Sequence, residues 1–141
     1  MALDSRVVIK RHGKTLVVVI SLAFANSAQA QGCDHNSLVQ SSMNACAHLD
    51  WQTADKELNR VYKLAKAVAL RMDEYLEDGQ VPAANMLRNA QRAWIPFRDH
   101  ACDAESLAMR GGSAQPLLYW GCMTRLTRQR TEDLQYFADA N

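Results

Sequence analysis

Apolar side chains recur every three or four residues through most of the chain beyond residue 43, which is the spacing of one face of an α-helix. The longest series predicts one helix from about Met43 to Glu77. Its apolar members are Ala47, Trp51, Ala54, Leu58, Val61, Ala65, Val68, Met72 and Tyr75. A small domain has to bury such a seam against its own helices, so we favour packing within the chain over an intermolecular coiled coil.

A second helix is predicted from about Pro82 to Met109, after a break at Gly79. Glycine suits the C-terminal cap of the preceding helix, and proline suits the first turn of the next. The apolar seam of this second helix consists of Leu87, Ala90, Trp94, Phe97 and Ala101. Pro96 lies inside it, and because proline lacks an N–H group we expect a local bend or break there.

A third helix is predicted from about Pro116 to Ala138, after a turn that contains Gly111, Gly112 and Ser113. Because short connections favour antiparallel neighbours, the sequence predicts an all-α fold. We expect a small disulfide-stapled bundle of about three helices, built on a long antiparallel hairpin of the first two. The glycine turn is a candidate interaction loop, since loops on rigid scaffolds commonly bind partners; an ordinary helix connection is the alternative.

The first 30 residues have the composition of a signal peptide. Four cations between Arg6 and Lys14 precede the uncharged apolar run 16–25, and Ala28-Gln29-Ala30 offers small residues for cleavage. We predict cleavage after Ala30, which would leave the domain 31–141. The apolar run is short for an uncleaved membrane anchor, and the residues before Cys33 match a lipoprotein signal poorly.

The charge of the remaining chain argues against a nucleic-acid partner. Without the first 30 residues the chain would hold 12 basic and 14 acidic side chains, for a net charge of −2. Nucleic-acid binding needs a basic surface, which this composition does not supply. After cleavage of the signal we also expect no association with the membrane.

All four cysteines lie in the predicted domain, and an even number in a small exported domain favours two disulfides. In a hairpin that turns near Gly79, Cys46 and Cys102 would be about 15 Å out of register, whereas a disulfide needs Cα atoms within about 7 Å. Of the three pairings we therefore prefer Cys33–Cys46 with Cys102–Cys122. We expect no metal and no cofactor, because no C-x-x-C is present and the histidines do not fall at paired ligand spacing.

In the same hairpin register Asp55 approaches Arg98, so we expect an ion pair between the first two helices. Trp94 and Phe97 flank this pair and are expected in the core. The pair would fix the two helices against each other; a ligand-binding arginine is the alternative. Removing one partner of such a pair costs about 3–5 kcal/mol when the pair is buried and about 0–1 kcal/mol when it is exposed.

The sequence does not predict an enzyme. Glycan hydrolysis would need two carboxylates facing a cleft, and the available Asp and Glu residues fall where a solvated helix face would place them. No serine lies in a nucleophile elbow, and neither a phosphate-binding loop nor HExxH is present. We therefore expect a binding protein without catalytic residues.

Several short motifs occur together in this chain. They are Asn44-x-Cys46-Ala47, Ala54-Asp55-x-x-Leu58-Asn59-x-x-Tyr62, Leu87-x-x-Ala90-Gln91-Arg92-x-Trp94-Ile95-x-Phe97-Arg98-Asp99-x-x-Cys102, Gly111-Gly112-Ser113, and Cys122 with Thr127 and Arg130. Together they resemble the lysozyme inhibitor LprI family. The resemblance spans about Cys33 to Leu134 and implies an exported, disulfide-bonded helical domain that binds and inhibits lysozyme.

This chain departs from the family's naming member, which looks like a lipoprotein, in lacking a lipoprotein signal. We therefore expect a protein of the periplasm of a Gram-negative bacterium, with lysozyme as its expected partner. Inhibition would occur by a surface loop or helix end that blocks the substrate cleft. The alternative function is a structural or envelope-stress interaction protein with a different partner.

Overall fold

The computed structural model describes residues 33–140, so the proposed signal peptide 1–30 lies outside the described residues. Three α-helices account for most of residues 33–140: α1 (Gln40–Met72), α2 (Ala83–Ser106) and α3 (Gln115–Asp139). The 3₁₀ turns Asp73–Tyr75 and Leu107–Met109 follow α1 and α2. The predicted all-α class and the expected number of helices are confirmed.

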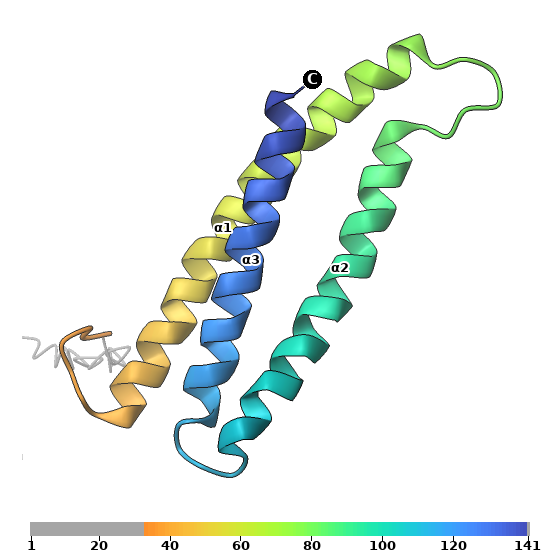
Figure 1. Cartoon of the computed structure of the whole chain (residues 1–141). Helices are drawn as coiled ribbons and strands as arrows, with labels where there is room; N and C mark the ends of the chain where they lie inside the picture. The colour runs from red at the N-terminus through yellow and green to blue at the C-terminus, as the bar shows by residue number, and fades with distance from the viewer. Residues whose placement is uncertain (1–32, 141) are drawn as a thin grey trace, which may run out of the picture.

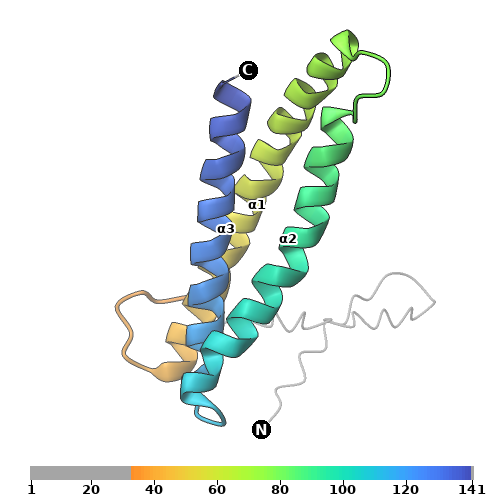
Figure 2. The ribbon, with the colours of Figure 1, turned by 45° about the vertical axis from the view of Figure 1, so that its right-hand side comes forward.

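The helices run up, down and up, so that α2 is antiparallel to both α1 and α3 (Figures 1 and 2). The predicted hairpin of α1 and α2 is present, but α1 packs most extensively along α3, and α2 packs more closely on α3 than on α1. The third helix is therefore the common partner of the other two. No helix among residues 33–140 is long and apolar enough to cross a membrane.

Two groups of buried side chains form the core. The first consists of Leu58, Val61, Ala65, Ala69, Leu87 and Leu134 and joins all three helices. The second consists of Cys102, Cys122 and Met123, with Trp51, Tyr119, Trp120 and Leu126 packed around it. Burial of these side chains supplies the main stabilising contribution, as expected for a small bundle.

The prediction for the last residues of the α1 seam is wrong. Met72 and Tyr75 were expected to be buried, but they are 42% and 84% exposed. The reason is length, since α1 has 33 residues and α3 only 25. The last turns of α1 reach past the end of α3, where no third helix covers them (Figure 1).

The inward face of α2 is rotated from the predicted one. Phe97 was expected in the core but is 61% exposed, and Ala90 is also exposed. The side chains that face inward are instead those of Arg98 and Cys102, each one position later. Trp94 keeps its predicted role and packs against the first core group. α2 also continues through Pro96 without a break.

A carboxylate holds the loop between α1 and α2. Asp73, directly after α1, accepts hydrogen bonds from the backbone N–H groups of Ala83 (2.6 Å) and Ala84 (3.1 Å), at the start of α2. A negative charge at a helix N-terminus satisfies free donors and complements the helix dipole. Asp73 therefore caps α2 from ten residues away, because Pro82 has no side-chain donor or acceptor for this task.

Two glycines should respond in opposite ways to the same substitution. Gly79 has φ +85°, which strains any side chain with a Cβ, so Gly79→Ala should lower the free energy of unfolding by about 1 kcal/mol. Gly121 lies inside α3 with open space around its Cβ position, so Gly121→Ala should raise it by up to about 1 kcal/mol. Urea unfolding of both variants measures this; equal signs would contradict the backbone argument.

Candidate functional site

One end of the bundle holds most of the features that could serve a partner. We call it the disulfide end: it contains the start of α1, the turn 110–114 between α2 and α3, and both disulfides. The bonds are Cys33–Cys46 and Cys102–Cys122, the pairing that the helix register favoured. Cys102 and Cys122 are fully buried, and Cys33–Cys46 ties the segment before α1 to its second turn.

A buried arginine lies behind this end, at the meeting point of all three helices. Arg98 is 7% exposed. Its Nε and Nη2 lie 2.9 Å from Asp99 Oδ1, and its Nη1 lies 3.5 Å from Asp55 Oδ1 and 3.4 Å from Thr127 Oγ1. Every nitrogen of the guanidinium thus has an acceptor on α1, α2 or α3.

Two indole rings enclose the same guanidinium. Its carbon lies 5.0 Å from the Trp94 ring centroid and 6.0 Å from that of Trp51, within the range of cation–π attraction. Because Arg98 is buried and each guanidinium nitrogen already has an acceptor, the side chain is not available to a ligand from solution. The structure places it as the polar link between the helices.

The glycine turn is exposed but held at three points. Gly111 N–H donates to Gln115 Oε1 (2.9 Å), Gly112 N–H donates to Met109 O (2.9 Å), and Asn44 Nδ2 on α1 donates to Ser113 O (2.9 Å). Gly111 also has φ +74°, a conformation that favours glycine. The turn is therefore fixed against the start of α1 and presents a defined surface.

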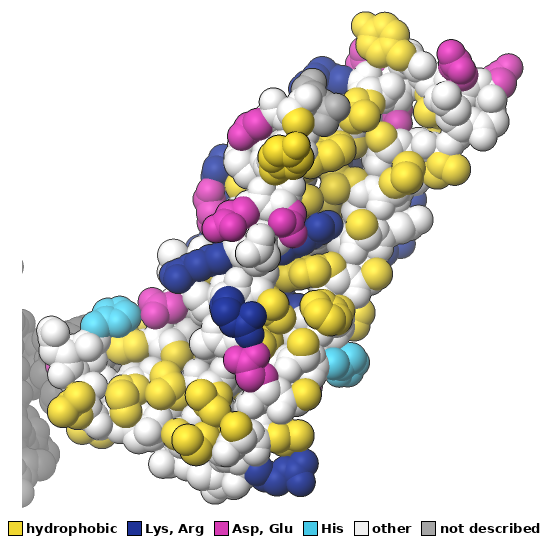
Figure 3. All heavy atoms as spheres, viewed as in Figure 1, with side chains coloured by type: hydrophobic (Ala, Val, Ile, Leu, Met, Phe, Trp, Pro, Cys, Tyr) yellow, Lys and Arg dark blue, Asp and Glu magenta, His cyan; other side chains and the backbone are white. Residues whose placement is uncertain are grey.

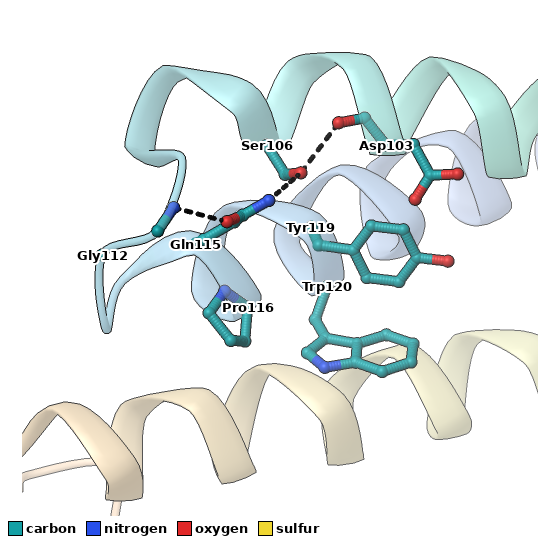
Figure 4. Close-up of a pocket in the computed structure, with 8 residues that line it drawn as sticks. Asp103, Ser106, Gly112, Gln115, Pro116, Tyr119 and Trp120 are labelled. Carbon is teal, nitrogen blue, oxygen red and sulfur yellow. Dashed lines mark hydrogen bonds between the residues drawn. The ribbon is translucent and has the colours of Figure 1, made fainter.

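A hollow of about 490 Å³ opens beside this turn, between the end of α2 and the start of α3 (Figure 4). Its lining consists of Asp103, Ser106, Gly111, Gly112, Gln115, Pro116, Tyr119 and Trp120. Tyr119 and Trp120 form the aromatic part, with their ring centroids 4.8 Å apart and nearly perpendicular. The hollow is open to solvent, so a protruding group of a partner could enter it.

Most polar groups of the hollow are already engaged. Ser106 Oγ donates to the backbone carbonyl of Asp103 (2.8 Å) and accepts from Gln115 Nε2 (3.4 Å), while Gln115 Oε1 accepts from the turn. No hydrogen bond or ion pair from residues 33–140 reaches the carboxylate of Asp103. Burial raises the pKa of the Tyr119 phenol above its usual value; the charges of Asp103 and Asp99 act in the same direction, and the charge of Arg98 opposes them.

Behind the hollow, an aromatic stack joins α1 to α3. The Trp120 ring lies 4.8 Å from the Trp51 ring and 4.4 Å from the His48 ring, measured between centroids. Trp51 in turn contacts Arg98, so the hollow rests on the same packed layer as the buried arginine. The Trp120 wall of the hollow is therefore packed against side chains of α1.

A second hollow, of about 550 Å³, lies between α1 and α3 and is lined in part by Asp50, Arg125, Arg128 and Glu132. Its charges are of both signs, so it selects no ligand by charge.

Among residues 33–140, Cys33, His35 and Cys46 bring potential metal ligands within 4.8 Å of one another. Both sulfurs are bonded in the disulfide and are therefore not free to bind a metal.

The sequence pointed to the turn but not to the hollow. Tyr119 and Trp120 lie within two turns of the start of the third helix, and their nearness to the glycine turn is the signal that could have indicated an aromatic surface there. Asp103 was expected on a solvated helix face, and it is exposed. Its position opposite the two aromatic rings depends on the crossing of α2 and α3, which local patterns do not record.

The comparison with protein families decides the relationship of this chain. The family model described as lysozyme inhibitor LprI matches residues 33–134. The chain belongs to this family. The match covers both disulfides, the buried arginine, the turn and the hollow, and it ends within α3.

Among curated proteins, the LprI-family chain is similar to "Uncharacterized protein R02472" of Rhizobium meliloti (strain 1021). The two are 39% identical over 114 residues, which is 79% of this chain and 82% of the relative. No solved structure gives a significant match. The assignment to the family therefore rests on the sequence match. The arrangement of the helices comes from the structure described above.

Proposed function

We propose that the protein is exported to the periplasm after removal of residues 1–30 and that it binds and inhibits a lysozyme. Membership of the lysozyme inhibitor LprI family carries this proposal. The two disulfides support it, because disulfides persist in oxidising compartments outside the cytoplasm. The proposed mechanism is steric and needs no catalytic residue of this chain.

We further propose the disulfide end as the contact surface, with the turn Gly111-Gly112-Ser113 at its centre. The turn is exposed yet held by hydrogen bonds, so binding would cost little ordering of the loop. The segments before α1 and after α2 also expose apolar side chains at this end, namely Leu38, Val39, Leu107 and Met109. Figure 3 shows apolar side chains gathered at the disulfide end of this face. Clustered exposed apolar groups mark protein contact surfaces.

The purified, oxidised protein should slow the lysis of bacterial cell walls by lysozyme in proportion to its molar ratio. Lysozymes of more than one type should be assayed, because the family membership does not specify the type. A stable complex would bury roughly 1,600 Å². No slowing of any lysozyme at molar excess would rule out inhibition. Recovery of a different envelope protein in a pull-down would then favour the alternative function in the envelope.

A matched pair of variants tests the contact surface. Ser113→Arg places a long side chain on the turn and should weaken inhibition by about tenfold or more, as expected for a clash inside an interface. Val81→Arg makes a comparable change in an exposed position of the α1–α2 loop, at the opposite end, and should leave inhibition unchanged. Equal inhibition by both variants would place the contact elsewhere.

A further inference from the structure

The hollow beside the glycine turn combines aromatic rings with one unpaired negative charge. The carboxylate of Asp103 extends from α2 toward the side of α3 that carries Tyr119 and Trp120 (Figure 4). None of the eight lining residues carries a positive charge. The hollow therefore has room and an aromatic wall, and its charge has no partner within residues 33–140.

We propose that this hollow receives the guanidinium group of an arginine side chain from the protein partner. This proposal rests on the proposed function, because the partner that supplies the arginine is taken to be a lysozyme. A guanidinium stacks on aromatic faces and forms a two-pronged contact with a carboxylate, which are the two groups that the hollow offers. In this contact Asp103 accepts the hydrogen bonds, and Tyr119 and Trp120 provide the stacking surface.

The hydrogen bonds inside the hollow favour a cation over a saccharide. A saccharide needs several free donors and acceptors as well as an aromatic platform. Here Ser106 and Gln115 are bonded to each other, and Gln115 is also bonded to Gly111, so their side chains have little capacity left. An anion is disfavoured by the charge of Asp103, because none of the other lining residues is charged.

The same chain already accommodates an arginine in this way next to the hollow. Arg98 lies against two indole rings, Trp51 and Trp94, and contacts the Asp99 carboxylate at 2.9 Å. Trp51 is stacked on Trp120, which lines the hollow. The hollow repeats the combination of aromatic faces and a carboxylate, but it is open and contains no arginine of its own.

An NMR titration of the oxidised protein with N-acetyl-arginine amide tests the hollow without any lysozyme. The signals of the Gly111 and Gly112 amides and of the Trp120 indole N–H should shift at millimolar ligand, as expected for one exposed charged contact. N-acetyl-glutamine amide and a chitin disaccharide, used as probes in parallel, should cause at most small shifts. Equal shifts with the glutamine probe, or larger shifts with the disaccharide, would overturn the proposal.

Two variants with the same change in charge provide the control. Asp103→Asn should lower the affinity for N-acetyl-arginine amide by about fivefold or more, because it removes the carboxylate from the hollow. Glu74→Gln removes an exposed carboxylate at the opposite end of α1 and should leave the affinity unchanged. Asp103 is exposed, so its replacement is expected to preserve the fold, which the spectrum itself reports.

The two proposals fail separately. If the arginine probe binds at the hollow but no lysozyme is inhibited, the proposed function is wrong and the hollow remains a site for an arginine of another partner. If lysozyme is inhibited equally by the wild type and by Asp103→Asn, and the probe does not bind, the function stands and the assignment of the hollow is wrong.

Discussion

Arg98→Met is expected to lower the free energy of unfolding by about 3 kcal/mol, the lower end of the range for removing one member of a buried ion pair. Methionine replaces most of the apolar stem, so the loss reports on the guanidinium. The lower end applies because the carboxylates that remain, on Asp55 and Asp99, are 35% and 40% exposed and can be hydrated. Urea unfolding followed by circular dichroism measures the effect.

The two sides of the ion pair should not be equivalent. Asp55→Asn should cost only about 1 kcal/mol, because Arg98 keeps its closer contact with Asp99 at 2.9 Å, and the distance to Asp55 is 3.5 Å. Arg92→Met, an exposed position on the same helix, should change stability by less than about 0.5 kcal/mol. A loss for Arg98→Met no larger than that for Arg92→Met would contradict a structural role of Arg98.

The helices themselves could be predicted from the sequence because their signals are local. The predicted start of α1 at about residue 43 lies near the observed Gln40, and those of α2 and α3 lie within one residue of Ala83 and Gln115. Apolar spacing, glycine and proline determine these positions within a few residues of chain. The disulfide pairing also followed from helix register, which depends only on the rise per residue.

The inward face of α2 could not be predicted because its central residue is charged. Hydrophobicity favours Phe97 over Arg98, yet the structure buries Arg98 and exposes Phe97. Burial of an arginine requires acceptors and aromatic rings from more than one helix, here including Asp55 and Trp51 on α1. Such a set of partners exists only after the helices pack, so no local pattern records it.

The hollow could not be predicted from the sequence either, because it also depends on how the helices pack. Tyr119 and Trp120 are adjacent in sequence, and the helical pattern alone does not show whether either ring is covered. Trp120 does pack against Trp51, but part of its surface and that of Tyr119 line an open space. Whether an aromatic side chain is covered or open depends on where α2 ends and how the turn 110–114 returns, which are properties of the assembled bundle.

Removal of the Cys102–Cys122 disulfide by a double substitution to alanine should lower the free energy of unfolding by about 3–5 kcal/mol. The two cysteines are 20 residues apart, and Cys33 and Cys46 are 13 apart, so loop-closure entropy predicts a similar contribution of about 3 kcal/mol for each bond. The two disulfides differ in how deeply their cysteines are buried. Cys102 and Cys122 are fully enclosed and contact Met123, so alanines would leave a cavity.

The corresponding variant without Cys33–Cys46 should lose less, about 2–3 kcal/mol, because Cys33 is half-buried at the edge of the bundle. Urea unfolding of the two double variants under identical oxidising conditions gives the comparison. Cys102–Cys122 joins α2 to α3 next to the hollow, so its loss should also lower the affinity for N-acetyl-arginine amide. Loss of Cys33–Cys46 should leave that affinity unchanged. Equal losses of stability would show that loop closure dominates over burial at both sites.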